Sequence, residues 1–288
     1  MVVSPACVLR NMKNIRIPFT LFSIMVVLAS CNRDDSGQPE TRAMASDESI
    51  ADFADRHLEG PVDAMTMRQG GAAPCGISSP YLSECVIITD SGEDVFPRTI
   101  TLDFGEGCTG PGGVTRSGVL DIVMTGDMDV LGSVRTTTFD EFQVGNLTLT
   151  GTRVLSNIGP NDEESQALFE QSHAMTIERN GHIITRTYEG ILAWLEGFDT
   201  EDCEDNVVER NGVASHSTAS AWGNSTRLIE AVVYDRSCGY PVSGTVTVER
   251  PVHNIVVDFG DGSCDNMATV SRNGNTYNLN LDTHEIDG

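Results

Sequence analysis

Apolar and polar residues alternate in short runs through most of the chain after residue 84. In the stretch from Val134 to Phe142, for example, threonines and charged residues lie between valine and phenylalanine. Successive side chains of a β-strand point to opposite faces, so a period of two predicts strands that bury one face. We expect about a dozen strands of this kind. They cover residues 86–89, 99–104, 119–125, 134–142, 147–155, 174–178, 182–195, 227–234, 242–249, 254–259 and 277–282.

Pairs of asparagine and glycine separate several of these runs. They are Gly145-Asn146, Asn180-Gly181, Asn211-Gly212 and Asn273-Gly274. Both central residues of a type I′ turn need a positive φ, and that turn matches the twist of the strands it joins. The pairs therefore predict hairpins. The fold class is mainly β, with hairpin-rich antiparallel strands arranged as an open curved sheet, a two-sheet sandwich or a closed barrel.

The β-rich region spans residues 75–288, as one domain or as two related halves, about 75–200 and 201–288. The acidic stretch 197–206 is the best internal boundary. Before it, residues 46–74 predict a short helix and a loop, because Ser46 is a suitable N-cap and apolar residues recur at helical spacing from Ile50 to Leu58. Gly60-Pro61 is expected to end this helix. Residues 31–45 are polar without periodicity, which predicts a flexible tether.

One strand–turn–strand unit occurs twice, which predicts an internal duplication. Asp103-Phe-Gly-Glu-Gly-Cys leads to Arg116-Ser-Gly, and Asp258-Phe-Gly-Asp-Gly-Ser-Cys leads to Arg272-Asn-Gly. In both copies the arginine follows the cysteine by eight positions.

Six cysteines lie between residues 32 and 288, an even number that indicates disulfides in an exported protein. Equivalent positions in the two copies predict the bridges Cys85–Cys108 and Cys238–Cys264. Cys75 and Cys203 are then left as the third pair. Each of the first two bridges closes a loop that is expected to contribute roughly 3 kcal/mol.

The first thirty residues have the pattern of a targeting segment. Lys13 and Arg16 precede an apolar run, 17–29, that is too short to span a bilayer comfortably. Leu28-Ala29-Ser30-Cys31 resembles a bacterial lipobox, in which the cysteine is acylated and becomes the first mature residue. We therefore expect a signal peptide over 1–30, translation from Met12, and a lipid anchor at Cys31 that holds the protein to a membrane.

The residues after Cys31 bear on localisation. Position 32 is Asn rather than Asp, so the usual inner-membrane retention signal is absent. The stretch 32–35 resembles the short export signal of surface lipoproteins in Bacteroidetes. We expect an outer-membrane lipoprotein that faces the periplasm or the cell surface.

The formal net charge of −24 excludes nucleic acid as a partner, because the chain offers few cations to replace counterions. Asp258, Asp261 and Asp265 are weak candidates for calcium ligands in the second copy of the repeat. The first copy has fewer acids, so we expect a structural turn, with no metal and no cofactor.

Two resemblances bear on the repeat. Asp258-Phe-Gly-Asp-Gly-Ser is similar to a turn of PKD domains, but Val257 stands where that family has tryptophan, and too few strands follow. The longer pattern, from Cys85 through Asp103-Phe-Gly-Glu-Gly-Cys108 and Arg116-Ser-Gly to Asp258-Phe-Gly-Asp-Gly-Ser-Cys264, resembles uncharacterised Bacteroidetes lipoproteins. This resemblance covers about residues 84–282. It implies a secreted β-rich lipoprotein and carries no known activity.

Catalytic signals are sparse in the chain. The six histidines are scattered, and no nucleophile elbow, zinc-binding helix motif or phosphate loop occurs. Four aromatic residues are candidates to stack on a sugar or to pack in the core: Tyr188, Trp194, Trp222 and Tyr234. We expect a non-enzymatic role in binding, scaffolding or the envelope, with a glycan or protein as ligand. The alternatives are a secreted glycan-active or other hydrolase, and a lipid-handling periplasmic protein.

Overall fold

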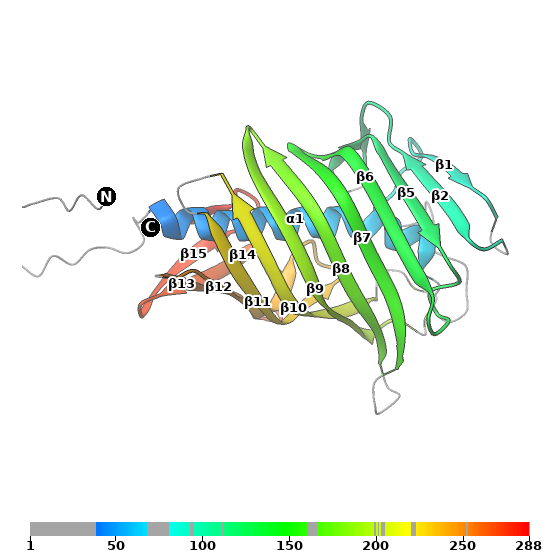
Figure 1. Ribbon diagram of the computed structural model, residues 1–288. Coiled ribbons are helices and arrows are strands. Elements are labelled where there is room, and N and C mark those ends of the chain that lie inside the picture. The colour runs from blue at the N-terminus through cyan, green and yellow to red at the C-terminus, as the bar shows by residue number, and fades with distance from the viewer. Residues whose placement is uncertain are drawn as a thin grey trace, which may run out of the picture. The chain divides into compact units, whose positions relative to one another are not determined.

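A computed structural model describes residues 39–67, 81–92, 95–110, 112–160, 166–198, 200, 202, 205–219, 223–251 and 253–287. The fold is mainly β, as predicted: one open antiparallel sheet of 16 strands with one N-terminal helix. Of the three arrangements considered, the curved open sheet is the one found. Figure 1 shows the strands side by side along the helix.

The helix is α1 (Pro39–Thr66). The strands are β1 (Ile87–Asp90), β2 (Arg98–Asp103), β3 (Cys108–Thr109), β4 (Thr115–Ser117), β5 (Val119–Met124), β6 (Val134–Val144), β7 (Leu147–Pro160), β8 (Ala167–Arg179), β9 (His182–Glu196), β10 (Val207–Thr218), β11 (Asn224–Asp235), β12 (Pro241–Glu249), β13 (Asn254–Asp261), β14 (Met267–Arg272), β15 (Asn275–Asn280) and β16 (Glu285–Asp287).

The strands pair almost entirely in sequence order, as a chain of hairpins predicts. The path runs β1-β2-β5 and then β6 to β16 in turn, with β3 and β4 beside it. Strand β9 pairs with β10 over most of its length, so the two expected halves belong to one continuous sheet. The described residues, from Pro39 onward, accordingly belong to one compact unit.

Three of the four Asn/Gly pairs lie at turns, and the fourth prediction was wrong. Asn180 and Asn273 have φ values of 52° and 50° between paired strands. Asn211-Gly212 lies inside β10 instead, at an irregularity of its register with β11. A Cβ atom at Gly212 would lie 2.5 Å from the carbonyl oxygen of Glu189, so the glycine permits a close approach of β9.

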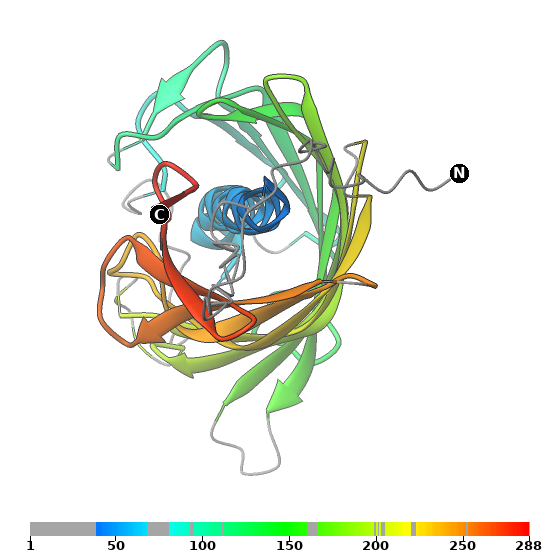
Figure 2. The same cartoon turned by 90° about the vertical axis from the view of Figure 1, so that its left-hand side faces the viewer.

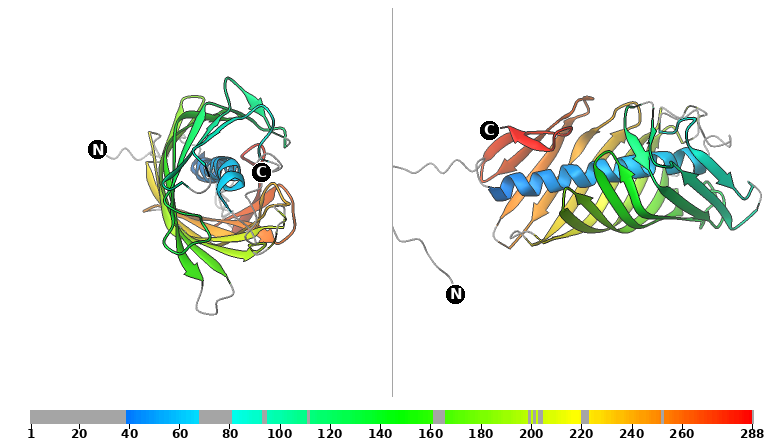
Figure 3. Two further views of the ribbon diagram at one scale, coloured as in Figure 1. Left: turned by 90° about the vertical axis from the view of Figure 1, so that its right-hand side faces the viewer. Right: turned by 90° about the horizontal axis from the view of Figure 1, so that it is seen from above.

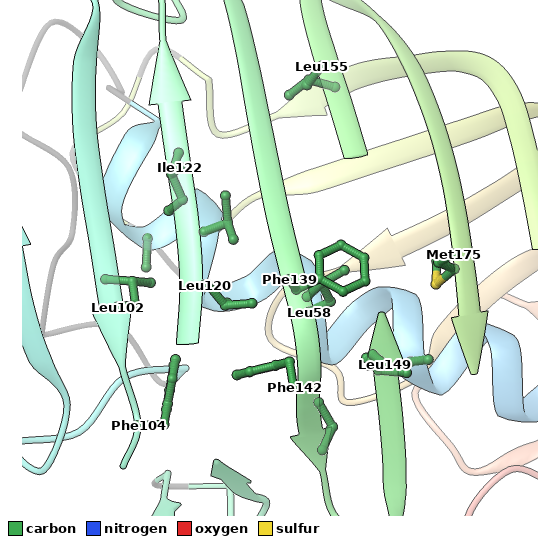
Figure 4. Packing of buried hydrophobic residues seen from close by; sticks show 14 of the residues in the cluster. Leu58, Leu102, Phe104, Leu120, Ile122, Phe139, Phe142, Leu149, Leu155 and Met175 are labelled. Carbon is green, nitrogen blue, oxygen red and sulfur yellow. The ribbon is translucent and has the colours of Figure 1, made fainter. Parts of the chain in front are cut away.

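Helix α1 lies along the concave side of the sheet, which curves around it (Figures 2 and 3). Two buried apolar clusters cover it. One joins Leu58 and Val62 to residues of β2 and β5–β9, and part of this cluster is shown in Figure 4. The other joins Met44 to strands β11–β15. The helix therefore supplies the second layer that a single sheet needs in order to bury its apolar face.

The helix is longer than predicted at both ends. It begins at Pro39, within the expected tether, and it continues through Gly60-Pro61 to Thr66. A proline inside a helix removes the hydrogen bond to the carbonyl four residues earlier, here that of His57. In this structure Nε of Arg116 donates to the His57 carbonyl oxygen at 3.0 Å. A side chain from β4 thus replaces the bond that Pro61 cannot make.

Candidate functional site

A set of inward-facing arginines follows the concave face of the sheet. Six of them occupy strand positions and one directly follows β12; all seven side chains point toward α1 and are 0–9% exposed. We call them the arginine array: Arg135, Arg153, Arg186, Arg210, Arg227, Arg250 and Arg272.

Acidic residues of α1 face this array. Five of them recur at intervals of three or four positions, which places them along one side of the helix. We call them the acidic stripe: Glu48, Asp52, Asp55, Glu59 and Asp63. The apolar pattern does not predict this stripe, although the spacing of the acidic residues can be seen in the sequence.

The central part of the stripe bridges neighbouring strands. Glu59 accepts from Arg153 at 2.7 Å and also pairs with Arg135. Asp55 pairs with Arg153 at 2.5 Å and lies 3.4 Å from Arg210. Strands β6, β7 and β10 are therefore joined through two carboxylates of one helix.

The same pattern extends in both directions along α1. Toward its N-terminus, Glu48 accepts from Nε of Arg227 at 2.9 Å. At the first turn, Glu40 lies 3.6 Å from Arg250 and 3.9 Å from Arg272. Charge pairing thus fixes both the depth and the rotation of the helix in the sheet.

Burial and pairing shift the acidities in this interface. Burial alone raises the pKa of Glu59, but Arg135 and Arg153 outweigh it and lower that pKa to about 2. Burial also opposes ionisation of Asp55, yet His173, Arg153, Arg186 and Arg210 hold its pKa well below the usual range. Burial raises the pKa of Asp63, and the charge of Glu59 adds to that rise. Glu59 and Asp55 are therefore ionised at neutral pH.

The two copies of the repeat adopt the same local structure. Asp103 Oδ1 accepts from the Gly105 amide at 2.8 Å, and Asp258 Oδ1 accepts from the Gly260 amide at 2.9 Å. The predicted bridges Cys85–Cys108 and Cys238–Cys264 are both confirmed. Cys75, Cys203 and the anchor cysteine Cys31 lie outside the described residues.

The arginine of each copy reaches α1. Arg116 contacts His57 in the C-terminal half of the helix, and Arg272 donates to Thr41 near its N-terminus. Sequence comparison of the two copies revealed the shared Arg-x-Gly but not what it contacts. The duplicated unit therefore holds the helix at two points.

The weak calcium candidates have separate structural contacts. Asp258, Asp261 and Asp265 each accept a hydrogen bond from a backbone amide two residues ahead. Within the described ranges, no group of three or more residues is arranged to hold a metal ion. The sequence Asp258-Phe-Gly-Asp-Gly is a turn here.

The C-terminal half of α1 borders a pocket of about 380 Å³. We call it the seam slot. Residues of α1 form one side of the slot. The other sides come from Tyr81, from the segment 112–116, from residues 236–240 and from Asp282. The lining includes Phe53, His57, Tyr81, Arg116 and Tyr240.

Two further arginines line the slot and have partners. Arg56 donates to Asp52 at 2.8 Å and lies 5.7 Å from the centre of the Tyr240 ring. Arg236 pairs with Asp63 and lies 5.3 Å from the centre of the Tyr81 ring. The slot is thus walled by arginine–aromatic contacts.

Two of the candidate aromatics are buried core residues, and Tyr234 is partly buried against the core. Trp194 and Tyr188 are 2% and 1% exposed, and the Tyr234 hydroxyl donates to Asp52 at 2.7 Å. None of these three presents a ring for stacking on a sugar. Trp222 lies outside the described residues.

The histidines gather around α1, which sequence reasoning missed. Ser49 and His284 come closest to a nucleophile with a base: Oγ lies 2.8 Å from Nδ1, and burial lowers the His284 pKa to about 4. Ser49 is 3% exposed inside the helix, and neither residue lines the seam slot. No carboxylate hydrogen-bonds to His284 among the contacts of the described chain, so the geometry is that of a helix–loop contact.

Comparison with known protein families, characterised proteins and solved structures finds no match to this chain. Among the described residues, no helix has the length and apolar character needed to cross a bilayer.

Proposed function

We propose that the protein is a lipid-anchored, non-enzymatic scaffold of the bacterial cell envelope, in which α1 joins the sheet to the anchor. The observation that carries this proposal is the burial of α1 from Thr41 to Thr66 beneath strands of the whole sheet. In the sequence, seven residues separate Cys31 from Pro39. An anchor at Cys31 would thus be continuous with the core of the fold.

The outer face of the sheet is the surface that such a scaffold would present. Thr138, Thr152, Thr187, Ser215 and Thr226 are exposed and stand in register across β6, β7, β9, β10 and β11, with Ala174 of β8 in the same row. Rows of hydroxyl groups suit hydrated, uncharged partners. A glycan or polar protein surface is therefore the kind of ligand that we expect on this face.

The two alternative functions have less support. A hydrolase needs a cleft at its catalytic pair, and Ser49 with His284 lies at a buried helix contact. Lipid handling needs an apolar groove, and here the apolar clusters of the concave face pack against α1. In the scaffold role, the Ser49–His284 contact and the apolar clusters both serve to hold α1 in the sheet.

The experiment separates the anchor from the sheet by cutting the chain between them. A protease site is inserted between Gly70 and Gly71, before Cys75, so that a third disulfide cannot hold the α1 fragment. The protein is labelled with palmitate, and the membranes that carry it are treated with the protease and washed. We expect the label on the α1 fragment and the sheet fragment retained on the membrane, because the ion pairs and apolar contacts of α1 persist.

The matched control carries Asp55→Ala and Glu59→Ala in the same cleavable chain. Without these carboxylates the sheet fragment should leave the membrane after cleavage. Release of the sheet from the unmodified helix would contradict the role of α1 as a mount. A Cys31→Ala chain that still takes up palmitate would contradict the anchor.

A further inference from the structure

We propose that the seam slot binds a small organic carboxylate and that Arg116 is the counter-ion of its carboxylate group. This inference does not depend on the scaffold role, because it concerns a pocket that would be present with or without a lipid anchor.

Arg116 differs from the other buried arginines. Nine arginines of the described chain are buried, and eight of them have a carboxylate oxygen within 4.0 Å. Arg116, 3% exposed, has none among the described residues. Within the described part of the chain, its guanidinium hydrogen-bonds to neutral acceptors alone, the carbonyl oxygen of His57 at 3.0 Å and Nδ1 of the same residue at 3.2 Å.

The contact with His57 explains why a hydrogen-bond donor stands at position 116, but it does not explain why that donor is charged. The His57 carbonyl lacks its helical donor because Pro61 has no N–H. Any neutral donor would serve that carbonyl equally well. A buried guanidinium without an anion is costly, so a positive charge at this position points to a partner that binds from outside the chain.

The other charged groups at the slot leave the charge of Arg116 unneutralised. Arg56 and Arg236 are paired with Asp52 and Asp63. Asp282 also lines the slot and is ionised, since hydrogen bonds from Tyr240 and Asn266 lower its pKa. Among the described residues, however, no carboxylate oxygen, that of Asp282 included, lies within 4.0 Å of the Arg116 guanidinium. Burial, together with Arg56 and Arg116, lowers the pKa of His57 to about 3, so this ring is neutral and adds no charge.

The size and walls of the slot define the ligand class. A pocket of about 380 Å³ admits a molecule the size of a monosaccharide. One unpaired guanidinium matches one negative charge, and a carboxylate suits its planar donors. Phe53, Tyr81 and Tyr240 line the slot and give the body of the ligand apolar surface to pack against. A singly charged organic acid, such as a uronic acid or an aromatic acid, meets these conditions.

Calorimetry of the full chain with four probes tests the assignment. The probes are D-glucuronate, benzoate, D-glucose and inorganic phosphate, at fixed ionic strength. We expect saturable binding of at least one of the two carboxylates, and at least tenfold weaker binding of glucose and phosphate. Equal binding of glucose and glucuronate would overturn the proposal, as would preference for phosphate or absence of binding by both carboxylates at 10 mM.

Two variants assign the charge to Arg116. Arg116→Gln keeps a neutral donor near His57 and should weaken carboxylate binding at least tenfold. Arg179→Gln, on β8 outside the slot, should leave binding unchanged. Equal binding by wild type and Arg116→Gln would overturn the proposal.

Stability without ligand provides an independent readout. Arg116→Gln removes an unpaired charge, so it should unfold at the same urea concentration as wild type or higher. Arg153→Gln breaks ion pairs to Asp55 and Glu59 and should unfold at lower urea. If Arg116→Gln lowers the midpoint as much as Arg153→Gln does, the charge of Arg116 is structural and the proposal fails.

Discussion

Glu59 of α1 places Oε2 at 2.7 Å from Nη1 of Arg153 on β7, with side chains that are 10% and 1% exposed. Its other oxygen pairs with Arg135 on the neighbouring strand β6. One helical carboxylate therefore bridges two strands inside the sheet. Buried ion pairs are weak evidence for high stability, but they make the position of each partner highly specific.

Replacing Glu59 with alanine should leave two buried arginines without their shared anion. We expect Glu59→Ala to lose about 3–5 kcal/mol of unfolding free energy, as for other broken buried pairs. Glu170→Ala, on the outer face of β8, should change it by less than about 0.5 kcal/mol. Urea unfolding of the three proteins measures both effects. Equal midpoints for Glu59→Ala and Glu170→Ala would show that the pairing has no energetic role.

Acid should destabilise the fold in two ranges of pH. Burial lowers the pKa of His57 to about 3 and that of His284 to about 4, from a usual value of 6.5. The unfolded chain therefore binds protons first, and the stability that these neutral rings contribute above pH 6.5 is lost as the pH falls toward 4 and 3. Glu59, lowered from 4.5 to about 2, contributes stability above pH 4.5 that is lost below it.

Urea midpoints at pH 7.5, 6, 5 and 4 measure this dependence. The raised pKa of Asp63 opposes the loss in the carboxylate range, so the histidine range is the cleaner test. His284→Asn should reduce the slope between pH 6.5 and 4. A flat profile over that interval would contradict neutral, buried histidines in the folded state.

The two confirmed disulfides should contribute similar amounts to stability. They span 23 and 26 positions, and loops of that length constrain the unfolded chain by about 3 kcal/mol. Cys85→Ser with Cys108→Ser, and separately Cys238→Ser with Cys264→Ser, should each lower the unfolding free energy by that amount. Peptide mapping of the oxidised protein checks the pairings. Recovery of Cys85 or Cys264 with another partner would refute them.

Gly60 should respond to alanine in the opposite way from an ordinary helical glycine. A Cβ atom there would lie 2.3 Å from Cδ1 of Tyr81, whose ring also contacts Arg236. Gly60→Ala should therefore cost about 1–3 kcal/mol, because the ring must move. In a Tyr81→Ala background the same change should gain up to about 1 kcal/mol from helix propensity. The same sign in both backgrounds would contradict the contact.

Much of the sheet follows from local patterns. Alternation and Asn-Gly turns predicted the strands from Val134 to Glu196, and the repeat predicted two disulfides, because these signals are local or duplicated. The length of α1 was missed because tertiary contacts override its local signals. The His57 carbonyl freed by Pro61 is satisfied by Arg116, which lies 59 positions away in the sequence.

The inner charges could be read only in part from the sequence. The acidic spacing from Glu48 to Asp63 predicts a stripe on one helix face, but polar helix faces usually meet solvent. Arginines at inward positions, such as Arg135 and Arg153, break the apolar alternation of their strands. The acidic stripe and the inward arginines can be interpreted only once the fold places them opposite each other. The sequence alone does not predict that pairing.

Native-state hydrogen exchange tests most directly whether α1 is a permanent core of the sheet. The amides of α1 between Met44 and Leu58 should exchange only by global unfolding, with the same free energy as those of β8 and β9. The urea dependence of exchange should match in the helix and in the central strands. Exchange of α1 at a lower free energy, while the strands stay protected, would show a helix that leaves the sheet and would contradict this account.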